Sequence, residues 1–184
     1  MTRVAVCHYG AGNVRSVLAA FTRLGATAVL ADEPGQMAAA DLAVLPGVGS
    51  AASAMSVLRE RGLDEALRRR VAAGGSTLGI CLGLQLALER TAEDGGVDGL
   101  ALLPGRAVRL CEGRVPRIGW ASVDPGGEAY YFAHSYAAET PAATATSEGI
   151  VAEARAGSFL GVQFHPEKSG RAGARFLERC LSRG

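Results

Sequence analysis

Apolar residues in the first half of the chain alternate between short continuous runs and positions spaced three or four residues apart. The continuous runs, each bounded by glycine, proline or polar residues, cover residues 3–7, 27–30, 41–45 and 77–81. The helically spaced stretches between them cover residues 13–24, 58–73 and 82–90. Continuous apolar strands alternating with amphipathic helices predict an α/β fold, with a mostly parallel central sheet and helices on both faces.

The second half of the chain has a different rhythm, because short strand-like stretches follow one another with only turn residues between them. They cover residues 115–123, 129–134, 144–146, 149–154 and 159–164. This pattern predicts antiparallel hairpins that extend the central sheet, followed by a closing helix over residues 173–181. The sequence contains no repeat or long linker, and 184 residues suit one domain, so we expect a single domain over residues 1–184.

Composition excludes several classes of protein. The chain is 48% hydrophobic and 20% charged, with a formal net charge of +1, so no bulk electrostatic field favours nucleic acid or membrane. The apolar stretch at the start, MTRVAVCHYG, is too short and too quickly interrupted for a signal peptide, and no apolar run approaches membrane-spanning length. The four cysteines are far apart without a CxxC pair. We therefore expect a cytoplasmic protein with reduced thiols and no zinc site.

The segment GICLG at residues 79–83 carries the sharpest chemical signal. It lies between a predicted strand and a predicted helix, which is the arrangement of a nucleophile elbow. The flanking glycines permit a tight turn that raises Cys81 above the sheet, and the positive end of the helix favours its thiolate. The N–H of Leu82 can then face a developing oxyanion. A buried cysteine at a glycine-rich turn is the alternative. The other cysteines, which lack this pattern, are Cys7, Cys111 and Cys180.

A cysteine nucleophile needs a base, and the base needs a group that fixes its orientation. The segment GVQFHPE at residues 161–167 offers both, because His165 follows a predicted strand and Pro166 prevents the strand from continuing. Glu167 is close enough in sequence to hydrogen-bond the imidazole. Of the two other histidines, His134 follows an aromatic strand and is interpreted as a pocket wall, and His8 as a structural residue.

Six motifs in order along the chain resemble those of the class I (triad) glutamine amidotransferases. They are YGAGN at 9–13, LPGVG at 45–49, GICLGLQ at 79–85, VPRIGW at 115–120, YFAHSY at 131–136 and GVQFHPEKSG at 161–170. Within that family the sequence is most similar to the glutaminase subunits of imidazole glycerol phosphate synthase, which supply ammonia in histidine biosynthesis. The resemblance implies hydrolysis of L-glutamine by Cys81, His165 and Glu167, without a metal or organic cofactor.

The resemblance also assigns further positions. It places the N–H of Val48 beside that of Leu82 in the oxyanion hole. The glutamine-binding positions that it implies are Gly49, Gln85, His134, Ser135 and Tyr136. The positions that face a partner are Asn13, Trp120 and Lys168. The partner that the resemblance implies is a cyclase subunit of (β/α)8-barrel type, which would form a heterodimer with this chain.

Two departures leave other functions open. His8 stands where the family usually has aspartate, and Ala121 where asparagine commonly follows the Gly-Trp pair. A triad amidotransferase that supplies ammonia to a different synthase would explain both departures. A stand-alone cysteine hydrolase or peptidase is a second alternative, although Gln85 and residues 134–136 suit a small amino-acid substrate. A nucleotide-binding module is disfavoured, because Arg15 breaks the dinucleotide fingerprint that begins at Gly10.

Overall fold

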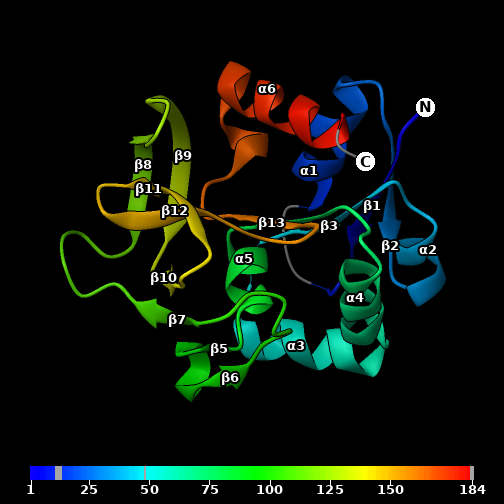
Figure 1. Cartoon of the computed structure of the whole chain (residues 1–184), viewed down its shortest axis with the longest axis horizontal. Coiled ribbons are helices and arrows are strands. Elements are labelled where there is room, and N and C mark those ends of the chain that lie inside the picture. The colour runs from blue at the N-terminus through cyan, green and yellow to red at the C-terminus, as the bar shows by residue number, and fades with distance from the viewer. Residues whose placement is uncertain (11–13, 48, 183–184) are drawn as a thin grey trace.

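A seven-stranded sheet forms the centre of the protein in the computed structural model, which describes residues 1–10, 14–47 and 49–182 (Figure 1). Its strand order is β11-β12-β13-β4-β3-β1-β2. The strands are β1 (Arg3–Cys7), β2 (Thr27–Ala31), β3 (Leu42–Leu45), β4 (Thr77–Ile80), β11 (Ala143–Ser147), β12 (Ile150–Ala156) and β13 (Phe159–Val162). The five from β2 to β13 are parallel, and β12 and β11 continue the sheet antiparallel. The predicted fold class is therefore confirmed.

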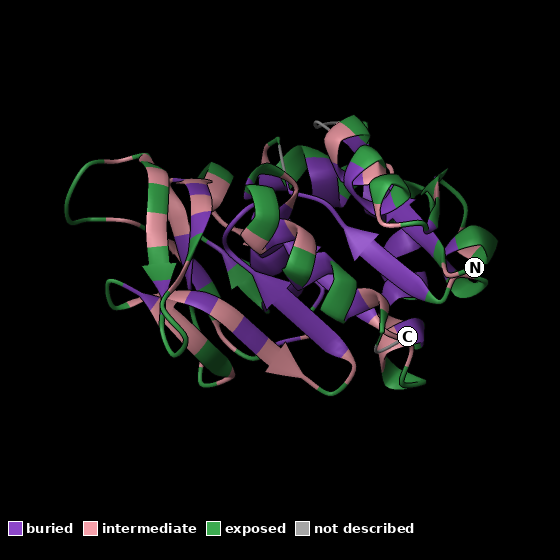
Figure 2. Ribbon diagram, turned by 90° about the horizontal axis from the view of Figure 1, so that it is seen from above, coloured by how far each residue is buried: buried purple, intermediate pink, exposed green. Residues whose placement is uncertain are grey.

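Helices cover both faces of this sheet (Figure 1). One face carries α1 (Val14–Arg23) and α6 (Gly170–Leu181), and the other carries α2 (Pro34–Ala38), α3 (Ala51–Glu60), α4 (Leu63–Ala72) and α5 (Leu82–Ala87). Side chains of β1 alternate between the layers, since Val4 and Val6 join the α1/α6 core whereas Ala5 and Cys7 join the α3/α4 core. Figure 2 shows the resulting buried centre. No described helix is long and apolar enough to span a membrane.

Helix boundaries differ from the prediction in the first half of the chain. The expected helix over residues 58–73 is two helices, because Gly62 adopts a left-handed conformation with φ of +67° that ends α3 and starts α4. Helix α3 begins earlier than expected, at Ala51, where the hydroxyl of Ser50 accepts from the N–H of Ser53. Helix α5 ends at Ala87 rather than at residue 90, and α2 was not predicted.

The antiparallel half of the chain is divided among three sheets. Of the predicted hairpins, β11–β12 extends the central sheet, whereas β8 (Arg117–Val123) and β9 (Glu128–His134) form a separate hairpin. A small four-stranded sheet contains β10 (Tyr136–Glu139), β7 (Arg106–Arg109), β5 (Arg90–Thr91) and β6 (Val97–Asp98). None of these four strands was predicted from the sequence.

Backbone segments pack directly on one another where β3 and β4 end. A Cβ atom added at Gly83 would lie 2.0 Å from the carbonyl oxygen of Leu45, and one added at Gly47 would lie 1.8 Å from that of Ile80. Both sites therefore require glycine. The loop after β3 and the turn after β4 are consequently held together, with residue 81 at their junction.

We expect Gly83→Ala to lower the free energy of unfolding by at least about 3 kcal/mol, because the neighbouring atom is backbone and has little freedom to move. Gly35→Ala is the matched control, since a Cβ at Gly35 meets nothing within 4 Å. That control should leave stability unchanged or raise it by up to about 1 kcal/mol. Urea unfolding of the two variants measures both effects, and equal stabilities would contradict the packing argument.

Candidate active site

Cys81 lies on a sharp turn between β4 and α5. Its φ of +51° and ψ of −107° lie in a region that non-glycine residues rarely adopt. Its N–H donates to the carbonyl of Val162 at 2.7 Å, and its own carbonyl accepts from Leu84 at 3.0 Å. On the other side of the turn, a Cβ at Gly79 would lie 2.8 Å from the carbonyl oxygen of Gly83. The glycines therefore permit the turn that holds the thiol above the sheet.

His165 and Glu167 reach the thiol from the segment that follows β13. This strand ends at Val162, earlier than predicted, and the N–H of His165 donates instead to the carbonyl of Tyr131 at 2.8 Å. The 3-10 turn at Pro166–Lys168 brings the Oε1 of Glu167 to 2.8 Å from the Nδ1 of His165. Because Nδ1 faces Glu167, Nε2 is the ring nitrogen left for the side chain of Cys81, which interacts with the imidazole and lines the same cavity. The three residues thus form one connected chain.

The two buried histidines of this region differ in charge. Burial lowers the pKa of His165, but its hydrogen bonds with Cys81 and Glu167 outweigh this effect and raise the pKa to about 9. Burial lowers the pKa of His134 to about 4, against the opposing effect of its hydrogen bond to the Tyr136 carbonyl. At neutral pH His165 is therefore an imidazolium that can give up a proton, whereas His134 is neutral.

A cavity of about 270 Å³ opens over the thiol. Its lining consists of Gly47, Gly49, Cys81, Leu82, Gln85, Glu93, Ala133, Ser135, Tyr136, His165 and Lys168. Four of the five predicted substrate-binding residues are in this set. The fifth, His134, is buried behind it, where its Nδ1 donates to the carbonyl of Tyr136 at 2.9 Å.

The remaining predicted positions lie outside the cavity or outside the described residues. Val48 and Asn13 belong to the part of the chain that the structure does not describe, so their proposed roles stay predictions. Trp120 lies on β8 with 58% of its surface exposed. Next to Val48, Gly49 has a φ of +104°, and the hydroxyl of Tyr9 donates to the carbonyl of Pro46 at 2.5 Å. This bond ties the end of β1 to the loop that borders the cavity.

Two polar residues near the thiol were not singled out from the sequence. Gln163 is completely buried, and its Nε2 lies 3.5 Å from the Sγ of Cys81. In the sequence, the indication of a role for Gln163 was its position two residues before His165. Glu93 lines the cavity, and its carboxylate accepts from the N–H of Ala51 at 3.1 Å. Burial raises the pKa of Glu93, against the effect of that bond.

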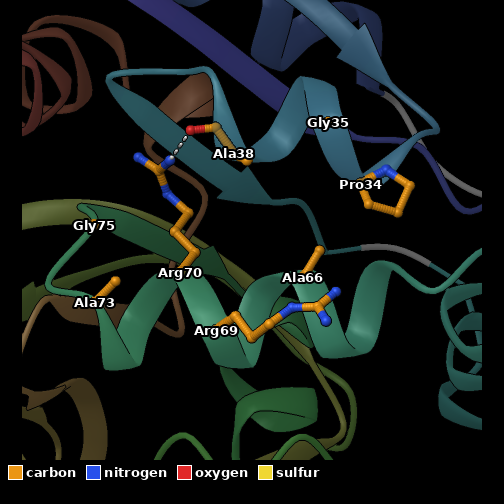
Figure 3. Close-up of a pocket in the computed structure, with 8 residues that line it drawn as sticks. All are labelled: Pro34, Gly35, Ala38, Ala66, Arg69, Arg70, Ala73 and Gly75. Atoms are coloured by element: carbon orange, nitrogen blue, oxygen red, sulfur yellow. Dashed lines mark hydrogen bonds between the residues drawn. The ribbon is translucent and has the colours of Figure 1, made fainter.

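A second cavity, of about 530 Å³, lies between α2 and α4, and its lining shares no residue with the cavity over the thiol (Figure 3). Its lining consists of Pro34, Gly35, Ala38, Ala66, Arg69, Arg70, Ala73 and Gly75. The Arg70 guanidinium donates to the backbone carbonyls of Met37, Asp41 and Ser76, among others. Arg70 therefore ties loops together, and the described lining offers neither a thiol nor a carboxylate.

Comparison with known families agrees with this geometry. The family described as "Glutamine amidotransferase class-I" matches residues 6–183. The chain belongs to the class-I glutamine amidotransferases. Among curated amidotransferases, "Imidazole glycerol phosphate synthase subunit HisH" of Symbiobacterium thermophilum is 43% identical, covering 96% of this chain and 92% of that protein. The protein of the same name from Methanothermobacter thermautotrophicus is 41% identical and covers 97% of each chain.

Solved structures have the same amidotransferase fold. One, titled "Crystal structure of glutamine amidotransferase", superposes with a TM-score of 0.83 at 21% identity, covering 98% of this chain and 97% of the other. Another, "Structure of PurLQS from Thermotoga maritima", gives a TM-score of 0.76 at 17% identity, with 99% of each chain covered. At such identities the similarity supports the fold alone.

The first prediction for the candidate site concerns the nucleophile. A glutamine-derived electrophile should label Cys81 and spare the exposed Cys111, because only Cys81 lies in the cavity beside His165. Cys7 should stay unmodified, since burial raises the pKa of its thiol to about 12. Peptide mass spectrometry reads each site, and Cys81→Ala should lower glutaminase activity at least about a thousandfold. Labelling of Cys111 with Cys81 untouched would refute the assignment.

The second prediction concerns the imidazole. In the folded protein His165 should titrate near pH 9, above the ordinary value of 6.5, so its ion pair stabilises the fold fully below pH 6.5. This stabilisation is lost as the pH rises from 6.5 to about 9. Glu167→Gln should lower the His165 midpoint by at least about one pH unit, measured by imidazole NMR. His134, which titrates near pH 4, is the internal control and should not move.

Proposed function

We propose that this chain is the glutaminase subunit of imidazole glycerol phosphate synthase, which hydrolyses L-glutamine and passes ammonia to a cyclase subunit. The observation that carries the proposal is the set of Cys81, His165 and Glu167, in which Glu167 holds His165, and Cys81 and His165 line a cavity sized for an amino acid. Relatives that bear the synthase subunit's name match nearly the whole chain at about 40% identity, which supports the choice of pathway.

The chemistry we propose is acyl transfer through a thioester. The Cys81 thiolate attacks the carboxamide carbon of glutamine, and the backbone N–H groups of Leu82 and Val48 stabilise the oxyanion. Collapse of this intermediate breaks the C–N bond, and the His165 imidazolium gives its proton to the departing nitrogen, releasing ammonia. The neutral imidazole then takes a proton from water as the water attacks the thioester carbon. The C–S bond breaks, which releases glutamate and the Cys81 thiolate and restores the ion pair with His165. A pKa near 9 keeps His165 protonated for the first of these proton transfers.

We further propose that a (β/α)8-barrel cyclase docks over the cavity mouth. Ile118 and Trp120, on the same side of β8, leave 63% and 58% of their surfaces exposed, which is unusual for large apolar side chains. Lys168 is exposed and lines the cavity, so a partner covering the mouth can meet its ammonium group. At neutral pH free ammonia is mostly protonated and no longer nucleophilic, and direct transfer through a closed interface avoids this loss.

The test of the proposed complex is glutamine hydrolysis by the pure chain, alone and then with the cyclase and its ligand. We expect little activity alone and strong stimulation in the complex, together with formation of the cyclase product from glutamine. Full turnover by the isolated chain, unchanged by the cyclase, would contradict the proposal. Stimulation by a different synthase, with none by the cyclase, would favour the alternative pathway that the departures at His8 and Ala121 leave open.

Surface variants test where the partner docks. Trp120→Ala should weaken binding of the cyclase at least about tenfold, because a large exposed aromatic side chain at an interface contributes strongly to affinity. Lys168→Ala should reduce the stimulation of glutamine hydrolysis by the cyclase and have a smaller effect on thermal stability. Val29→Ala is the control, since Val29 is also exposed (47%) but lies on β2, at the edge of the central sheet opposite to β11, the strand that β8 contacts. Titration of each variant with the cyclase measures the binding affinity. Weaker binding by the Val29 variant alone would place the interface elsewhere.

A further inference from the structure

We propose that Gln163 is a positioning residue that holds the sulfur of Cys81 in its ionised form and links it to the substrate-binding Gln85. This inference rests on the proposed role of Cys81 as the nucleophile. Gln163 lies immediately after β13, with no exposed surface, and its N–H donates to the carbonyl of Ala152 at 2.9 Å. Its backbone is therefore fixed, and its amide lies in a region of low dielectric constant where a polar contact has a large effect.

The orientation of the Gln163 amide follows from a backbone carbonyl. The Tyr136 carbonyl can only accept, so the group of Gln85 that lies 2.8 Å from it is the Nε2. The second hydrogen of that Nε2 faces the Oε1 of Gln163 at 3.2 Å. Gln163 must therefore present its own Nε2 to Cys81, at 3.5 Å from the Sγ. The reversed amide would place two donors against each other, so the whole chain has one consistent direction.

The sulfur consequently has two kinds of polar neighbour. The carbonyl of Ala133, 3.8 Å away, can only accept, and it favours the protonated thiol. The Nε2 of Gln163 can only donate, and together with the His165 imidazolium it favours the thiolate. Loss of the Gln163 amide would remove one of the two groups that oppose the effect of the Ala133 carbonyl. Gln163 thus shifts the balance toward the reactive form without touching the substrate.

Gln163 also determines which atom of Gln85 faces the substrate. Both hydrogens of the Gln85 Nε2 are used by Tyr136 and Gln163, so the amide presents its Oε1 to the cavity that it lines. A substrate N–H group can donate to that oxygen. Without Gln163 the Gln85 amide loses one of its two constraints. Removal of Gln163 should therefore raise the KM for glutamine as well as lower kcat.

The experiment measures alkylation of Cys81 by iodoacetamide across a range of pH, resolved by peptide mass spectrometry. Gln163→Met keeps the shape of the side chain and removes the donor. The pH at which Cys81 reaches half its plateau rate should rise by about one unit, with about a tenfold lower rate below that midpoint. The exposed Cys111 is the internal reference, and its profile should not change.

Two further variants make the result decisive. Gln163→Glu is isosteric, and its carboxylate should ionise before the thiol and raise the Cys81 midpoint further than Gln163→Met does. Gln36→Met is the matched control, because the Gln36 side chain accepts from Asp32 and Glu33 in a distant turn. It should leave the Cys81 profile at the wild-type midpoint. Thermal unfolding of each variant identifies any loss of fold.

An unchanged Cys81 midpoint in folded Gln163→Met would overturn the proposal. The proposal would also be overturned if the Cys111 profile shifted in the same way, or if Gln36→Met shifted the Cys81 midpoint. Either result would reflect a general change in the fold rather than the loss of one contact at Cys81. Alkylation requires neither glutamine nor a partner, so the result is independent of the proposed pathway. A shifted midpoint in a chain that fails to hydrolyse glutamine with any cyclase would refute the proposed function and leave the Gln163 contact standing.

Discussion

The backbone contact between the loop after β3 and the turn after β4 determines where chemistry can take place in this protein. The two strands are parallel neighbours, so their carboxyl ends meet at one edge of the sheet. Gly83 lies against the Leu45 carbonyl, and Gly47 against the Ile80 carbonyl, with no room for a side chain at either place. Cys81 is thereby held in an unfavourable backbone conformation that the surrounding packing enforces.

Around this fixed sulfur, the charge state of the site depends on burial together with a few directed hydrogen bonds. His134 and His165 are both buried. Burial determines the lowered pKa of His134, whereas the contacts with Cys81 and Glu167 outweigh burial and raise the pKa of His165. The neutral imidazole of His134 and the charged imidazole of His165 therefore have different roles. His134 supports the wall through the Tyr136 carbonyl, whereas His165 is available for proton transfer.

The sequence was informative where a function requires a particular residue in a local pattern. The turn at residues 79–83 and the spacing of His165 and Glu167 are local features, and both were identified from the sequence. The continuous apolar runs likewise predicted which segments form the parallel strands. The contacts of Gln163 were not predicted, because they depend on segments brought together by the sheet, with Gln85 on α5 and Tyr136 on β10. Glu93 was missed for a related reason, since its turn belongs to a small sheet of very short strands. The break at Gly62 shows that one left-handed glycine overrides a continuous helical periodicity.

The β8–β9 hairpin connects the outer surface to the nucleophile over a very short path. Ile118, 63% exposed on β8, pairs directly with Ala133 on β9 in the antiparallel register. The carbonyl of that same Ala133 lies 3.8 Å from the Cys81 Sγ. The surface proposed for docking and the acceptor that faces the thiol therefore belong to one cross-strand pair. A displacement of this hairpin would change the distance of the Ala133 carbonyl from the sulfur and would carry with it the Tyr131 carbonyl that accepts from His165, whereas Gln163 stays bonded to Ala152 on β12.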